Sequence, residues 1–168
     1  MTTLPKPTPT ILAIILAAVS HTAHAQTAAD YNAVGFENYQ AQNWLEAIAN
    51  FERAYSLAPE NETIRRNLSN AYQAEANRLA DNSAMRGAIE YMLAAIEVNP
   101  SGSKAFIQLG SYYLREGLVN EAIFRLEEAV ELSPGDVDAH FLLGEAYYRD
   151  NDAESALVQW KWVEQIEP

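Results

Sequence analysis

Side chains that could carry out catalytic or metal chemistry are scarce in this sequence of 168 residues. Cysteine is absent, which excludes disulfides, thiolate nucleophiles and zinc–thiolate sites. Of the three histidines, His21 and His24 lie in an apolar leader, and His140 takes a position where an aromatic side chain is expected to pack. The remaining residues assemble no Ser-His-Asp set, histidine pair or glycine-rich phosphate loop. We therefore expect no enzymatic activity, no cofactor and no metal site.

One acidic stretch begins like a calcium-binding loop. Asp150, Asn151 and Asp152 stand in the order of such a loop, but Ser155 occupies the position that requires glycine. A polar turn between two helices explains this stretch better.

The charged side chains indicate binding rather than catalysis. Eleven basic and 23 acidic residues give a formal charge of −12. Removing residues 1–25 would leave ten basic and 23 acidic side chains, a charge of −13. Nucleic acid and anionic membrane surfaces repel such a chain, so neither is expected as a partner.

Residues 1–25 read as a cleaved signal peptide. Lys6 precedes an uncharged apolar run over residues 11–19, and Ala23-His24-Ala25 offers small residues around a cleavage point. The run is shorter than the roughly 20 residues that a membrane span needs, although an uncleaved anchor is the alternative. No second apolar stretch follows, so we expect an exported, periplasmic or secreted chain over 26–168 with no stable membrane insertion after cleavage.

Small residues and prolines recur in one frame along the rest of the chain. The spacings are 41, 34 and 34 residues in two columns: Pro59, Pro100, Pro134 and Pro168; and Ala47, Ala88, Ala122 and Ala156. A third column of small residues lies upstream: Gly35, Ser69, Gly110 and Gly144. Small side chains allow two helices to approach closely, and each proline ends a helix. The pattern predicts four helical hairpins.

The repeated unit resembles a known family. Leu109-Gly110, Tyr113, Ala122, Ala129 and Pro134 match the tetratricopeptide repeat, and the resemblance extends over residues 28–168. It implies an all-α solenoid of four helix-turn-helix repeats, a right-handed superhelix with the first helices lining a concave groove. The repeats would span about 28–61, 62–102, 103–136 and 137–168. It also implies a protein-binding scaffold, with a protein or peptide as the partner.

The second repeat is seven residues longer than the others, and the extra residues lie between Tyr72 and Ala88. Seven residues are about two helical turns. We expect a hairpin with longer helices that projects past its neighbours, with Asp81-Asn82-Ser83 as a turn that leads to an N-cap. A loop insertion is the alternative.

The family pattern assigns a set of residues to the groove: Asn32, Phe36, Tyr39, Arg66, Asn70, Gln73, Lys104, Ile107, Ser111, Arg115, Phe141, Glu145, Tyr148 and Arg149. This set holds four basic residues and one acid, unlike the chain as a whole, and predicts an acidic or carboxylate-bearing peptide as ligand. Alternatively, these basic groups pair with glutamates of adjacent helices.

Some members of the family hold a C-terminal carboxylate in a clamp of lysine and asparagine side chains. Asn67 and Lys104 match two clamp positions, whereas Asn32, Phe36 and Gln108 do not match the others. A full clamp is therefore not expected.

The sequence ends at Pro168, where repeat arrays usually continue into a polar capping helix. The last helix carries Trp160, Trp162 and Ile166 on more than one face. Uncovered apolar surface often marks a contact, so we expect this end to dock against a second copy or a partner. In that case the chain would be a self-assembling structural subunit. The alternative is that Trp162 lies flat on the surface.

Overall fold

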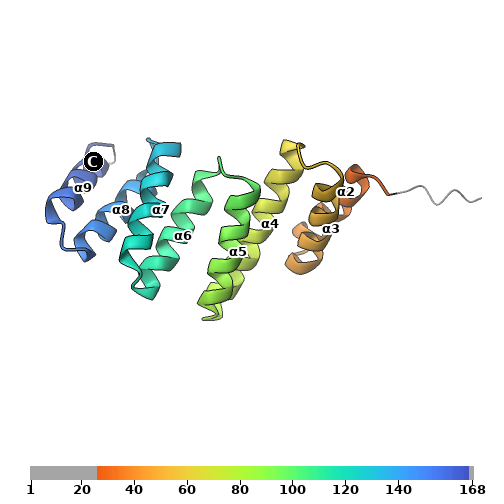
Figure 1. Cartoon of the computed structure of the whole chain (residues 1–168), viewed down its shortest axis with the longest axis horizontal. Coiled ribbons are helices and arrows are strands. Elements are labelled where there is room, and N and C mark those ends of the chain that lie inside the picture. Colours follow the sequence, from red (N-terminus) through yellow and green to blue (C-terminus); the bar gives the residue numbers. More distant parts are fainter. Residues whose placement is uncertain (1–25, 167–168) are drawn as a thin grey trace, which may run out of the picture.

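The computed structural model describes residues 26–166 as a single row of helical hairpins (Figure 1). In that range eight helices follow one another: α2 (Ala28–Gln40), α3 (Trp44–Leu57), α4 (Glu62–Asp81), α5 (Met85–Val98), α6 (Ser103–Glu116), α7 (Val119–Leu132), α8 (Val137–Arg149) and α9 (Ala153–Ile166). Each packs against the next, so the four predicted repeats and the all-α solenoid are confirmed. The leader lies outside these residues. No helix among the described residues is both long and apolar enough to cross a bilayer.

The column of small residues lies where the two helices of a hairpin cross. A Cβ atom added to Gly110 would lie 2.5 Å from Cγ of Leu126, and one added to Gly35 would lie 2.7 Å from the ring of Phe51. In the last hairpin the same addition to Gly144 would collide with Trp160. A large side chain of the second helix therefore fills the space above each glycine, as the sequence predicts.

The turn inside every hairpin has the same backbone geometry. One residue takes a left-handed conformation: Gln42 (φ 61°), Ser83 (φ 62°), Gly117 (φ 75°) and Asn151 (φ 66°). The next amide donates to a carbonyl five residues earlier, as Leu118 N–H does to Tyr113 O at 2.9 Å. This is the Schellman arrangement that ends helices. In the second hairpin Asn82 and Ser83 form the turn, as the sequence predicts, whereas Asp81 still belongs to α4; Ala84 follows at the N-cap position of α5 without a side-chain bond.

The seven extra residues of the second repeat all lie in one helix. α4 has 20 residues, whereas α2, α6 and α8 have 13 or 14. α5 has 14 residues, the same length as α3, α7 and α9. The expectation that both helices of this hairpin are longer is therefore wrong, and so is the loop alternative. α4 alone is longer, by about 10 Å at 1.5 Å per residue.

The longer α4 packs against its two neighbours at different levels. Leu68 and Ala71, in its first half, share a core cluster with Phe51 of α3. Ala76 and Ala80, in its second half, share another cluster with helices α5 and α6. Since seven residues are nearly two full turns, both halves present the same face to the core. The array therefore contains a step of about two turns at α4.

Candidate functional site

A polar pocket lies on the side of the first helices, where α2, α4 and α6 meet. It measures about 140 Å³. It is lined by Tyr39 of α2, by Asn70, Gln73, Ala74 and Asn77 of α4, and by Lys104 and Gln108 of α6. This volume is below the roughly 300 to 1,000 Å³ of small-molecule sites, so it suits a single side chain of a larger ligand.

Lys104 is the only basic residue that lines this pocket. It stands in the first turn of α6 and is exposed. Within residues 26–166 its ammonium group makes no ion pair or hydrogen bond, and the same is true of the guanidinium of Arg66 on α4. Both groups are therefore available to an anionic ligand.

Side-chain amides of α4 and α6 form the floor of the pocket around Lys104, and others continue along α4 toward α2. Asn67 donates to Asn32 Oδ1 at 3.0 Å, which ties α4 to α2. The Tyr112 hydroxyl donates to Asn77 Oδ1 at 2.5 Å, which ties α6 to α4. Gln108 Oε1 is buried without a hydrogen-bond partner among the described residues. Amides both donate and accept hydrogen bonds, so this floor complements a peptide main chain.

Tyr112 stays protonated over the physiological range. Burial raises the pKa of its hydroxyl to about 12, with Arg115 opposing and Asp81 reinforcing the rise. The hydroxyl therefore remains a donor to Asn77. Tyr112 thus holds one wall of the pocket in place without facing the ligand, because its ring is buried in the core.

The two arginines of the predicted groove at α6 and α8 are engaged within the fold. Arg149 Nη1 donates to Leu114 O at 2.7 Å, and Arg149 Nη2 pairs with Glu145 of its own helix. Arg115 Nη2 lies 3.5 Å from Ala80 O. Each arginine thus reaches the C-terminal end of the preceding first helix, where free carbonyls attract cations. The alternative that groove cations pair with glutamates of adjacent helices is therefore wrong for these residues: the glutamate that Arg149 meets lies on its own helix, and Lys104 and Arg66 meet none among the described residues.

The other predicted groove residues lie to either side of the pocket. Phe36 adjoins it through a smaller pocket shared with Tyr39 and Asn70. Phe141 and Tyr148, on α8, are 52% and 62% exposed, and Ser111 is partly buried on α6 between them and the pocket. Aromatic surface thus flanks a polar centre.

Three pocket residues were missing from the sequence prediction: Ala74, Asn77 and Gln108. The repeat columns align Lys104 with Thr63, which lies 41 residues earlier. In the fold, Lys104 shares its pocket with Asn70, which lies 34 residues earlier, because α6 packs on the second half of α4. The sequence showed the length of the insertion, but it did not show which half of α4 contacts α6.

His140 packs in the last hairpin, as predicted. Its ring is buried and stacks on Trp162, with ring centroids 3.8 Å apart. Its nitrogens lie 2.7 Å from Gln159 Oε1 and 3.1 Å from Pro134 O. Among the described residues, no group of three or more acidic or histidine side chains could hold a metal ion.

The apolar residues that are exposed on α9 are only in part those that the sequence predicted. Trp160 donates to Phe141 O at 3.2 Å and covers Gly144, and Trp162 is partly buried against His140. Both indoles therefore pack on α8. The exposed apolar side chains of this helix are Leu157, Val158 and Ile166, each at least half exposed. Docking through this end stays a prediction, and Ile166 is the predicted member that is exposed.

Comparison with known proteins fits this architecture. The sequence profile of the tetratricopeptide repeat matches residues 74–136 and 107–160, which together cover just over half of the chain. The chain belongs to the tetratricopeptide repeat family. A curated relative, the TPR repeat-containing thioredoxin TTL4 of Arabidopsis thaliana, is 36% identical over 84 residues. That stretch is 50% of this tetratricopeptide repeat protein and 11% of the relative, so the chain spans about a tenth of the relative's length.

Solved structures show the same fold. MamA superimposes with a TM-score of 0.61 and 20% identity, covering 91% of this chain and 85% of its own. MamA 41-end from Desulfovibrio magneticus RS-1 gives 0.57 and 18%, with 83% and 75% covered. YrrB, described as a TPR protein with an unusual peptide-binding site, gives 0.57 and 25%, with 94% and 76% covered.

Proposed function

We propose that this tetratricopeptide repeat protein is an exported adaptor that holds an acidic or carboxylate-bearing peptide segment of a partner protein in its concave groove. The observation that carries the proposal is Lys104: it has no internal ion pair, and it stands among amide side chains in a pocket sized for one side chain. A ligand carboxylate would meet the ammonium, while the amides would bond the neighbouring peptide groups.

The description of YrrB supports a peptide as the ligand class, since that protein has the same fold and a peptide-binding site. The acidic outer surface supports the same assignment. The second helices α3, α5, α7 and α9 carry ten acidic and four basic residues, so an anionic segment is repelled from that side. On the groove side Lys104 and Arg66 offer it cations without internal ion pairs among the described residues.

The test is a charge reversal in the groove with a matched reversal outside it. The probes are labelled octapeptides rich in Asp and Glu, compared with octapeptides in which Asn and Gln replace them. We expect Lys104→Glu with Arg66→Glu to weaken binding of the acidic peptides at least ten-fold, measured by fluorescence anisotropy on the full chain. Arg53→Glu with Lys161→Glu, on α3 and α9, should weaken it less than three-fold. Equal losses in both variants would mean a general charge effect and would contradict the groove.

Export rests on the leader and has its own test. A C-terminally tagged full chain, produced in a host with a Sec pathway, should be recovered outside the cytoplasm with Gln26 as its first residue. N-terminal sequencing checks this outcome. A product that retains Lys6 and stays with the membrane would instead support the anchor alternative.

A second function, self-assembly through α9, is favoured by one observation: Leu157 and Val158 are exposed side by side on the outer face of the helix. A second copy covering this face would bury both side chains. Sedimentation velocity over a hundred-fold concentration range should then show a mass increase that Leu157→Glu abolishes. A constant monomer mass would contradict self-assembly and leave the groove proposal intact.

A further inference from the structure

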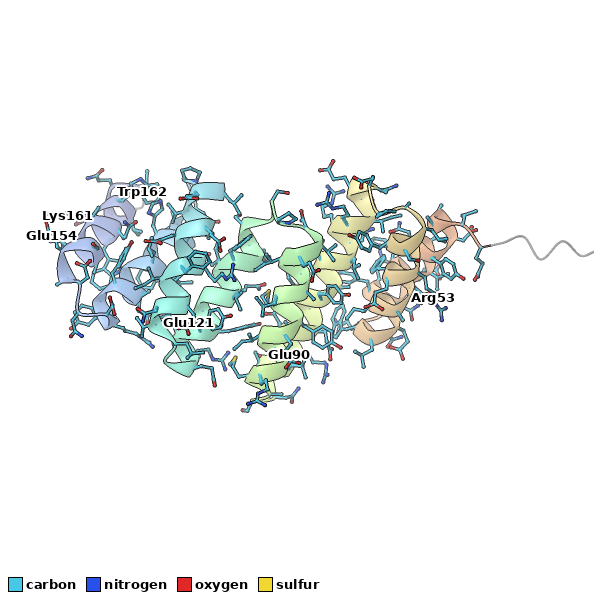
Figure 2. The ribbon with its side chains drawn as sticks, in the orientation of Figure 1. Arg53, Glu90, Glu121, Glu154, Lys161 and Trp162 are labelled. Carbon is cyan, nitrogen blue, oxygen red and sulfur yellow. The ribbon has the colours of Figure 1, made fainter. Side chains whose placement is uncertain are left out.

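A second pocket lies on the opposite side of the array, among the second helices. This outer notch measures about 310 Å³ and is lined by Glu52 of α3, Tyr72 of α4, and Glu90, Tyr91 and Ala94 of α5. α3 and α5 each pack against α4, and the notch is the space left between them. Glu90 is labelled on α5 in Figure 2, on the same side as Glu121 of α7 and Glu154 of α9.

The step at α4 changes which part of α5 lies beside Tyr72. Tyr113 of α6 occupies the column of Tyr72, and it adjoins the first turns of α7, at Asn120, Glu121 and Phe124. Because α4 is two turns longer than α6, Tyr72 lies beside the middle of α5 instead. There its ring meets Tyr91, with centroids 5.9 Å apart and planes inclined by 46°.

The notch is aromatic and acidic, and no basic residue lines it, although the charge of Arg78 acts on Tyr91 from nearby. The Tyr72 hydroxyl donates to Glu52 Oε1 at 2.7 Å, which leaves the other carboxylate oxygen free of internal bonds among the described residues. Glu90 forms no ion pair within residues 26–166 and is exposed. The nearby Glu75 is already satisfied, since it is buried and bound to both donors of Arg78. Two carboxylates, neither of them in an ion pair within the described residues, therefore flank two tyrosine rings.

The titration of the tyrosines agrees with a negative field in the notch. Burial raises the pKa of Tyr91, the charges of Glu75 and Glu52 raise it further, and the charge of Arg78 opposes the rise. Burial also raises the pKa of Tyr72, with its bond to Glu52 adding to the effect. Both rings thus stay neutral at physiological pH and keep the electron-rich faces that attract cations.

The neighbouring notch on α7 contains the contact that the outer notch lacks. There Arg125 stands 5.0 Å over the ring of Phe124 and pairs with Glu128 at 2.8 Å. Arg125 occupies the column of Tyr91, and Phe124 occupies that of Glu90. The α7 notch therefore supplies its own guanidinium, whereas none of the residues lining the outer notch is basic.

We infer that the outer notch binds an arginine side chain of a partner protein. A planar guanidinium can stack on a tyrosine ring while its edge donates to two carboxylates, which an ammonium group cannot do. This site goes beyond the groove proposal: it lies on the other side of the array and takes a ligand of opposite charge. A partner that presents an acidic segment and an arginine would engage both sides.

The experiment uses the full chain and two capped peptides, acetyl-Gly-Gly-Arg-Gly-Gly-amide and the same peptide with citrulline. Citrulline keeps the shape of arginine but has no charge. Ring signals of Tyr72 and Tyr91, assigned through the Phe variants, are followed by NMR. We expect the arginine peptide to shift both rings and to bind at least ten-fold tighter than the citrulline peptide, with a lysine peptide in between.

Matched variants separate the notch from general charge. Glu52→Gln with Glu90→Gln keeps an acceptor for Tyr72 and should lower arginine-peptide affinity about ten-fold. Glu90→Gln alone, at an exposed position, should lower it about three-fold with helicity unchanged by circular dichroism. Glu121→Gln with Glu154→Gln removes the same charge outside the notch and should change it less than two-fold.

Equal binding of arginine and citrulline peptides, or equal losses in the notch and control variants, would overturn the assignment. The groove variant Lys104→Glu with Arg66→Glu should not weaken the arginine peptide. Failure of the notch and failure of the groove are therefore separate outcomes.

Discussion

The α4–α5 and α6–α7 hairpins are copies of one repeat that differ in the length of a single helix. In the α6–α7 hairpin Gly110 lies beneath Leu126, and a first helix of 14 residues ends level with its partner. In the α4–α5 hairpin a first helix of 20 residues carries two small core residues, Ser69 and Ala76, one heptad apart. A helix can therefore gain about two turns and still present the same face to the core. New surface then forms wherever the neighbours no longer align.

Both candidate sites of this protein lie at that difference. On the groove side the step places Lys104 beside Asn70. On the outer side it places Tyr72 beside Tyr91. Both sites therefore include residues of the irregular hairpin.

The largest expected effect concerns the regular hairpin. Gly110→Val would force Leu126 away from the helix crossing and should lower the free energy of unfolding by about 3 kcal/mol. The matched change Gly135→Val, at a position with no atom within 4 Å, should cost less than about 0.5 kcal/mol. Urea denaturation followed by circular dichroism measures both. Similar costs at the two glycines would show that α6 and α7 do not cross as closely as described.

The next effect compares ion pairs in the two hairpins. Glu75 of α4 is buried beneath Arg78, whereas Glu128 of α7 forms a partly exposed pair with Arg125. Glu75→Gln should therefore cost about 2 kcal/mol, because a charge-assisted bidentate contact is lost inside the protein. Glu128→Gln should cost less than about 0.5 kcal/mol. Denaturant midpoints distinguish these values, and equal costs would contradict the burial of Glu75.

A pH series tests the contact between the two hairpins, where Tyr112 of α6 meets Asn77 of α4. The Tyr112 pKa is about 12 in the fold and about 10 in an unfolded chain, so the unfolded state loses its proton first as pH rises. The contribution of Tyr112 is thus complete below pH 10 and declines toward pH 12. Tyr112→Phe should be destabilising at pH 8, and its deficit should shrink by about 1.5 kcal/mol at pH 11. A deficit independent of pH would contradict the raised pKa.

The smallest effect concerns the serine that replaces glycine in α4. Ser69 Oγ donates to Ala95 O at 3.0 Å, a contact that Gly110 cannot make in its own hairpin. Ser69→Ala should cost about 1 kcal/mol, the usual worth of one buried hydrogen bond. Thermal unfolding in parallel with Ser111→Ala, which is partly buried and forms no described hydrogen bond, provides the control. Equal losses of stability in the two variants would contradict a stabilising hydrogen bond from Ser69 to Ala95.

The sequence predicted most of the fold because the relevant signals are local. The proline and alanine columns located every hairpin, and Gly35, Gly110 and Gly144 marked the crossings. The polar turns were also placed correctly. The left-handed residue that the four turns share was not predicted. It is a glycine only at Gly117, whereas Gln42, Ser83 and Asn151 adopt this conformation in the other turns.

The groove was predicted in part. Tyr39, Asn70 and Lys104 do share a pocket, whereas Asn77 and Gln108 were missed. Arg115 and Arg149 were expected to meet a ligand, but they reach helix ends instead. A column alignment shows which face a residue occupies; it does not show which backbone carbonyl lies within reach of a long side chain.

The sequence by itself therefore determined the number of hairpins, the faces that pack and the size of the irregularity, because helix periodicity and small residues act over a few neighbouring positions. The tertiary structure alone decided that the extra two turns belong to α4, that α3 and α6 contact different halves of it, and that Lys104 and the tyrosine pair come to lie at the step. Those outcomes depend on packing between residues some 20 to 40 positions apart. The repeat columns align Lys104 with Thr63, and a shift by the seven extra residues would align it equally well with Asn70. Only the close packing of the core selects one of these two alignments.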